Sequence, residues 1–279
     1  MKIILNLFIF FVRLVTEIYF EIISANPAID IDSMIDNKTF EKKINFILYS
    51  QQSLIFQPRA RGEDEEYSGR QKAAGDFGPK KCLHQNPNLT AFVPGQGQKS
   101  FRAMTGEQYP TFWFYVPYLS DSKLSAHFKL MFDETAEIVY EDNKIELFTT
   151  SPGGIVRIQL PQNKGLKFNK NYYWSFTIIC DERERDSDIY VDGYVARVQA
   201  RTEFESSENA GAEQKAIRYA KDGLWNETIS TLINELCPRD SQKAKDRIIE
   251  LLQSEYVGLA SSAEKYVYTI LQECQNLGN

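Results

Sequence analysis

The chain has 279 residues, enough for one large domain or two small ones, and a formal net charge of −6. An acidic chain has no general electrostatic attraction to nucleic acid, so we expect no nucleic-acid partner. The chain has only two histidines, His84 and His127, and its four cysteines form no Cys-x-x-Cys pair. Both features disfavour a zinc site or histidine-based catalysis, and we expect no metal, no cofactor and no catalytic residue.

The first 25 residues resemble a degenerate signal peptide. Lys2 precedes the apolar run 3–12, and the residues at 24 and 25 are small, as before a cleavage site. Three charged residues interrupt the pattern: Arg13, Glu17 and Glu21. An amphipathic helix, or an upstream extension from a misassigned start, is therefore the alternative, and the apolar run is too short to span a bilayer. We predict a periplasmic or secreted protein without a transmembrane span, with a cytoplasmic location as the alternative.

Residues 26–88 are predicted to be a disordered or weakly ordered linker. Between residues 58 and 85 the chain is polar and contains four glycines and two prolines. Such a composition buries little apolar surface and favours an extended, mobile chain. We expect order to begin near Leu89.

Residues 89–205 are predicted to form short β-strands. In the segment 126–132 every second residue is apolar, the pattern of a strand with one buried face. Further strands are expected at 111–116, 156–160, 172–180 and from 189. Residues 137–149 are expected to form two short strands that turn at 141–143, and Gly193 is expected to mark a bulge. Short strands separated by turn residues favour an antiparallel, Ig-like β-sandwich.

Residues 206–279 are predicted to form about four short helices, because the apolar period changes to 3.6. One such face consists of Ile229, Leu232, Ile233 and Leu236. Gly223, Pro238 and Gly258 would end successive helices. The first pair looks somewhat like a tetratricopeptide hairpin, but one hairpin is not a solenoid. We therefore expect this region to pack on the sandwich.

Two predicted strands carry aromatic side chains on both faces, at 112–115 and at 172–174. One face of each must fill the core, which leaves Trp113 and Tyr115, or Tyr173, on the other. Exposed aromatic side chains on a sheet can bind a glycan or a peptide. These three residues are our candidate ligand-binding residues, although we favour the alternative that the helical region covers them.

The densest acidic segment lies between the last two predicted strands. It contains Asp181, Glu182, Glu184, Asp186 and Asp188. A calcium site needs six to eight converging oxygens, and the alternating arginines at 183 and 185 oppose this, so we favour a solvated hairpin loop. A hydrolase with two carboxylates brought together in space stays an alternative, because such a pair has no fixed sequence spacing.

Several short sequence motifs of this chain occur together in a known protein family. They are the residues LTAFVP at 89–94, YPTFWFYVPY at 109–118, PGGIV at 152–156, YWSF at 173–176 followed by ICD at 179–181, and IYVDG at 189–193. In this order the chain resembles a cyanobacterial domain of unknown function family, DUF928, from about Phe56 to the C-terminus. The resemblance implies an exported protein, and it implies no activity or cofactor.

Members of this family tend to have a cysteine at both of the positions that Cys82 and Cys180 occupy here. The resemblance therefore implies a disulfide between Cys82 and Cys180. The alternative is that Cys180 is a small buried apolar residue and Cys82 a free thiol. We expect Cys237 and Cys274, at helix ends, to be packing residues. The favoured function is a non-catalytic interaction or scaffold module of the cyanobacterial cell envelope with a protein or glycan partner. The alternatives are a carbohydrate- or peptide-binding domain and a hydrolase.

Overall fold

A computed structural model describes residues 53–59, 69–73, 88–96, 99–117, 124–147, 153–200 and 211–277. All of them belong to one folded unit, residues 52–279. The predicted signal peptide at 1–25 lies outside the described residues, as do most of the predicted linker and the predicted boundary at 205. Within the described ranges, none of the helices combines the length and the hydropathy that a bilayer span requires.

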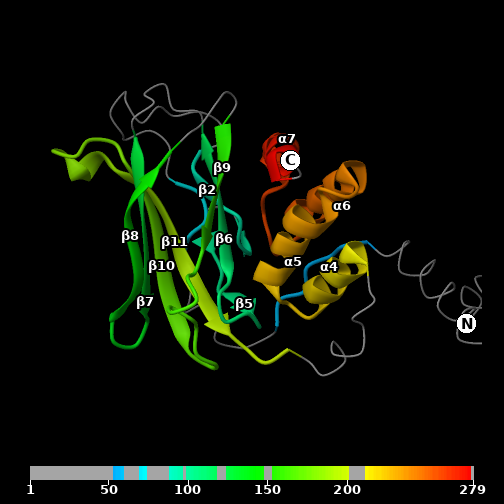
Figure 1. The fold of residues 1–279 in the computed structure, drawn as a ribbon, viewed down its shortest axis with the longest axis horizontal. Helices are drawn as coiled ribbons and strands as arrows, with labels where there is room; N and C mark the ends of the chain where they lie inside the picture. Colours follow the sequence, from blue (N-terminus) through cyan, green and yellow to red (C-terminus); the bar gives the residue numbers. More distant parts are fainter. Residues whose placement is uncertain are drawn as a thin grey trace, which may run out of the picture. The chain divides into compact units, whose positions relative to one another are not determined.

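Two sheets pack face to face (Figure 1). The five-stranded sheet contains, in spatial order, β5 (Ala103–Thr105), β11 (Ile189–Arg197), β10 (Asn171–Ile179), β7 (Ser125–Phe132) and β8 (Ile138–Glu146). The three-stranded sheet contains β2 (Thr90–Ala91), β6 (Thr111–Pro117) and β9 (Gly153–Gln159). All pairs are antiparallel except β5 with β11. Apart from the short β5, the two sheets contain seven strands, which in chain order are β2, β6, β7, β8, β9, β10 and β11. The first, second and fifth of these form one sheet, as in the immunoglobulin fold, so this is the predicted Ig-like β-sandwich.

The core between the sheets is rich in aromatic side chains. Phe114 of β6 stacks on Phe176 of β10, with ring centroids 4.3 Å apart and an interplanar angle of 13°. Phe128 and Trp174 pack on the same pair, and all four side chains are buried. The second and sixth strands are the two that antibody domains join by a disulfide. In this protein an aromatic stack links them instead.

Tyr172 forms a second Ig-like feature at the start of β10. Its side chain is buried, and its hydroxyl accepts a hydrogen bond from the backbone N–H of Lys167, 2.7 Å away. A tyrosine near the start of the sixth strand that bonds to backbone a few residues upstream is a tyrosine corner. It fixes the path of the chain from the three-stranded sheet to β10.

Two details of the sheets differ from the sequence prediction. Residues 138–146 form one strand, β8, and the turn expected at 141–143 is absent. Two register shifts against β7 absorb the extra residues of β8, so the chain continues without turning. Gly193 marks no bulge, because it pairs in register with Trp174. A Cβ at Gly193 would lie 2.7 Å from both the Trp174 ring and the Ser100 hydroxyl, so close packing requires the glycine.

Four helices follow the sandwich, as predicted. They are α4 (Ala212–Lys221), α5 (Trp225–Thr231), α6 (Ser241–Gln253) and α7 (Ala263–Leu277). A π-helical segment, η3 (Leu232–Leu236), continues α5, and the described residues also contain two 3-10 turns, η1 (Arg185–Ser187) and η4 (Ala260–Ser262). The Asp240 side chain caps α6 by accepting from Lys243 N. Figure 1 shows the helices on the side of the sandwich formed by β6 and β9.

Cys237 and Cys274 form a disulfide that joins the end of η3 to α7, with Cα atoms 5.9 Å apart. Our expectation that they are plain packing residues was therefore wrong. Each cysteine ends or interrupts an apolar helix face, and the antiparallel packing of these helices brings the two faces together. A cysteine on a packed helix face is compatible with either role until its neighbour is known.

Two parts of the predicted linker belong to the folded unit. In residues 53–59, which form no regular secondary structure, Leu54 and Phe56 are buried and the Phe56 ring packs edge-on against Trp225 at 5.1 Å. Residues 69–73 contribute β1 (Gly69–Arg70), which pairs with β4 (Lys99–Ser100) beside β3 (Gly95–Gln96). These two segments are therefore ordered, unlike the linker we predicted. Leu54 and Phe56 belong to a short apolar run, and Gln71 and Ala73 are buried although residues 69–73 are mostly polar.

Candidate functional site

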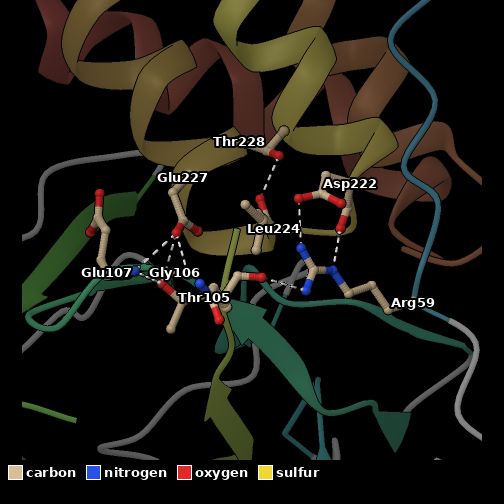
Figure 2. Close-up of polar contacts among 9 residues, drawn as sticks. Arg59, Thr105, Gly106, Glu107, Asp222, Leu224, Glu227 and Thr228 are labelled. Carbon is tan, nitrogen blue, oxygen red and sulfur yellow. Dashed lines mark hydrogen bonds and ion pairs between the residues drawn. The ribbon is translucent and has the colours of Figure 1, made fainter. Parts of the chain in front are cut away.

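A buried carboxylate joins α5 to the sandwich (Figure 2). Glu227, in the first turn of α5, is only 6% exposed. Its Oε1 atom accepts hydrogen bonds from the Thr105 hydroxyl at 3.2 Å, from the Gly106 N–H and from the Glu107 N–H at 3.1 Å. One oxygen thus holds the whole turn that follows β5.

The same turn brings a second carboxyl group close to Glu227. Burial raises the pKa of Glu227, even though its hydrogen bonds to the turn oppose the shift. Desolvation, and then the charge of Glu227, raises the pKa of Glu107 to about 7. Glu107 is an exposed residue, so water partly screens its interaction with Glu227. Burial therefore disfavours the charged form of both carboxyl groups at this junction.

This pair is the nearest approach to the hydrolase alternative. It assembles two carboxyl groups from residues far apart in sequence, as that hypothesis requires. However, Glu227 is buried, and its Oε1 is fully used in holding the backbone. Its Oε2 has no hydrogen-bond partner within the described part of the chain. The geometry fits a junction between helix and sandwich better than a site that a substrate enters.

A second clamp lies next to the first one (Figure 2). Arg59 forms an ion pair with Asp222, donates from Nε to the Asp222 carbonyl at 2.7 Å, and donates from Nη1 to the Gln199 carbonyl at 3.0 Å. One guanidinium therefore ties three segments together: residues 53–59, the end of α4 and the chain after β11. Only arginine offers enough donors in one plane for this arrangement.

The helices cover two of the three candidate ligand-binding residues. Trp113 is 2% exposed and donates from its indole N–H to the Ser230 hydroxyl on α5, 3.0 Å away. Tyr115 is fully buried, with its ring 5.1 Å from that of Tyr266 on α7. The favoured expectation of a helical cover is confirmed, and an exposed platform at Trp113 and Tyr115 is wrong.

Tyr173 lies on the opposite outer surface, that of the five-stranded sheet. Its hydroxyl donates to Asp192 Oδ2 at 2.8 Å, and its ring lies 5.4 Å from that of Tyr194 on the neighbouring strand. Burial, and then Asp192, raises the pKa of Tyr173. Arg70 lies over the ring of Tyr190, 4.5 Å from its centroid. We call Tyr173, Tyr190, Tyr194, Asp192 and Arg70 the tyrosine face.

The helices leave this face open. In the described part of the chain, helix contacts with the sandwich fall mainly on β5, β6 and β9. Tyr190 is 39% exposed, and Tyr173 and Tyr194 are half-buried. Sequence alternation identified Tyr173, but it missed Tyr190 and Tyr194, whose strand reads as apolar at every second position without showing which face is outward.

The remaining sequence candidates do not converge. The acidic loop between β10 and β11 uses Asp188 to accept from Cys180 N at 3.0 Å and to pair with Arg185. Across the described residues, no group of three or more His, Cys, Asp and Glu side chains could hold a metal ion. His127 Nε2 is hydrogen-bonded to Glu141 Oε1, 3.0 Å away, on the outer surface of the sheet.

Two other sequence candidates lie outside the described part of the chain. His84 is one. Cys82 is the other, so its bond to the buried Cys180 stays a prediction.

A protein-family model described as Domain of Unknown Function (DUF928) matches residues 67–267, more than half of the chain. The chain belongs to the DUF928 family. The DUF928 region contains Glu107, Glu227 and the tyrosine face, whereas Arg59 and Cys274 lie outside it.

Comparison with other proteins adds little to this assignment. No curated protein matches the chain. A crystal structure of a DUF3244 family protein with an immunoglobulin-like β-sandwich fold, from Bacteroides vulgatus, is similar at 10% identity. The match covers 32% of this chain and 82% of that one, with a TM-score of 0.19. The Ig-like assignment therefore rests on the strand order of the DUF928 protein itself.

Proposed function

We propose that this DUF928 protein is a non-catalytic interaction or scaffold module of the cyanobacterial cell envelope. The observation that supports this best is the contrast between its two outer sheet surfaces. Helices α5 and α7 cover the aromatic residues of β6 on one surface, and the hydrogen bonds of Trp113, Glu227 and Arg59 hold the helical region there. The other surface presents ordered tyrosines on rigid strands, which suits recognition because such side chains lose little conformational entropy on binding.

A location outside the cytosol is part of this proposal. The support for it is the Cys237–Cys274 disulfide, whose two cysteines are 2% and 3% exposed. Disulfides persist in oxidising compartments and are rare where thiols are kept reduced. Alkylation of the protein in its native compartment tests the location, because both cysteines should resist labelling until a reductant and a denaturant are added. Labelling without reductant would overturn it.

The partner of the module is tested by photo-cross-linking in cells. A photo-reactive residue at Tyr190 should form cross-links to a partner. The same residue at Tyr268, a 55% exposed tyrosine on α7, should form none. Equal cross-linking from both positions, or none from Tyr190, would refute a role for the tyrosine face.

A carbohydrate or peptide ligand at the tyrosine face is the second candidate function. It is favoured by the combination of flat rings with charged groups, since Asp192 and Arg70 lie beside Tyr173 and Tyr190. A glycan array and a peptide array on the purified protein test it. We expect Tyr190→Ala to reduce any binding about tenfold and Tyr268→Ala to leave it unchanged, as a few aromatic residues carry most binding energy. No wild-type binding on either array would remove this candidate.

A further inference from the structure

Each sheet of the sandwich ends in two edge strands, and an unprotected edge can pair with another chain through its free N–H and C=O groups. The edges are β5 and β8 in the five-stranded sheet and β2 and β9 in the three-stranded sheet. The four edges differ in how they are protected against such pairing.

Three of the edges carry protection. Met104 of β5 forms a bridge to Leu224, and Thr90 of β2 forms a bridge to Lys72, so other segments cover parts of both edges. Edge strand β8 has two register shifts and carries three acidic residues and one lysine: Glu141, Asp142, Glu146 and Lys144. Bulges and charges of this kind discourage pairing between edges.

The fourth edge, β9, is contacted by α7, but among the described residues it has no register shift, no cluster of charges and no bridge to another segment. It pairs with β6 through seven consecutive residue pairs without any register shift. Across the described residues, no strand pairs with its other side. Its sequence, GGIVRIQ, contains one charge, at Arg157. Ile155 and Val156 pack against the core yet stay half-exposed, because the sheet ends at β9.

We propose that β9 is an assembly edge and that its partner is β9 of a second copy of this chain, paired antiparallel about Val156. Full-length pairing of a seven-residue strand with itself requires this centre. Gly153 then opposes Gln159 of the second copy, and Arg157 opposes Ile155, so like charges do not face each other. The two three-stranded sheets become one sheet of six strands.

The side chains agree with this arrangement. Val156 lies opposite Phe114 on the core-facing side of the sheet, so the two copies of Val156 would meet there and exclude water. Ile155 lies opposite the buried Tyr115, on the helix-covered side. β9 and the tyrosine strands β10 and β11 belong to different sheets, so pairing at β9 does not depend on the tyrosine face.

The association should be weak and dependent on salt. One strand pair buries less than the roughly 1,200–2,000 Å² of a stable interface. Each copy also carries a formal charge of −6, and this repulsion is screened as the ionic strength rises. We therefore expect a monomer–dimer equilibrium that shifts toward dimer with protein concentration and with salt.

Analytical ultracentrifugation of the full chain tests the edge. Ile155→Lys should weaken dimerisation at least about tenfold, because a charge on an edge strand opposes pairing. The matched control is Ile138→Lys on β8, which places the same charge at a half-exposed isoleucine of a protected edge. It should leave dimerisation unchanged. Thermal unfolding of both variants shows whether each is folded.

Cysteine cross-linking tests the register and does not depend on the lysine variants. Val156→Cys should form an interchain disulfide under mild oxidation, because residue 156 opposes its own copy within the Cβ spacing of a strand pair. Ile138→Cys should not, and peptide mapping identifies the linked cysteines. A wild-type protein that is monomeric at every concentration and salt would overturn the proposal. So would equal effects of the two lysine substitutions, or cross-linking at 138 rather than 156.

Discussion

The two outer surfaces of the sandwich start from the same sequence pattern and end in opposite states. Strands β6 and β10 both carry aromatic residues on both faces. On β6 the outward residues Trp113 and Tyr115 are buried by α5 and α7, whereas on β10 the outward Tyr173 stays half-buried beside Tyr194. Alternation shows which side chains share a face. It does not show whether another part of the chain covers that face.

The largest expected difference between the two surfaces is in stability. Trp113→Ala should lower the free energy of unfolding by about 3–5 kcal/mol, because it leaves a ring-sized cavity under α5. It also removes the hydrogen bond to Ser230. Tyr173→Ala is the matched change on the open face and should cost about 1–2 kcal/mol, mainly the lost bond to Asp192. Equal costs in denaturant unfolding would mean that the two surfaces are covered alike.

Loss of the Cys237–Cys274 disulfide should lower the stability less than Trp113→Ala does. The disulfide stabilises only the helices that cover the sandwich. Replacing Cys237 and Cys274 by serine opens a loop with a sequence separation of 37. The chain-entropy model gives a loss of about 2–4 kcal/mol. Adding reductant should lower the thermal midpoint of the wild type by more than that of the double variant, which keeps only the predicted Cys82–Cys180 bond. Peptide mapping of the wild type without reductant tests the predicted Cys82–Cys180 bond.

The smallest expected effect is on pH dependence, at the junction between helices and sandwich. The pKa values of Glu107 and Glu227 are raised in the folded protein, and that of Glu107 reaches about 7. A carboxyl group with a raised folded pKa stabilises the fold fully below its unfolded pKa, and this contribution is lost as the pH rises through the folded pKa. The free energy of unfolding should therefore decrease as the pH rises from about 4.5 to about 7.

Glu227→Gln tests this account, because it removes the buried acid and its charge effect on Glu107 while keeping an oxygen for the turn. The free energy of unfolding of this variant should vary less from pH 5 to pH 8 than that of the wild type. Glu264→Gln, on the exposed surface of α7, removes one acidic residue without touching the junction and should behave like the wild type. A pH dependence unchanged in Glu227→Gln would show that the junction does not titrate in this range.

The sequence by itself determined the classes of structure and where one replaces the other. The side-chain period is 2 in a strand and 3.6 in a helix, so the change of period after residue 200 separated the sandwich from the helices. Alternation also identified the buried side of β6, β7 and β10, because each strand has one face that must avoid water.

Only the tertiary structure decided which surfaces meet. Trp113 and Ser230 are 117 residues apart in the sequence, and Thr105 and Glu227 are 122 apart. No local pattern records such contacts, because each residue taken alone is compatible with exposure. The same holds for Cys237 and Cys274, whose pairing depends on how η3 packs against α7. Periodicity is a property of one segment, whereas cover, clamps and disulfide partners are properties of two.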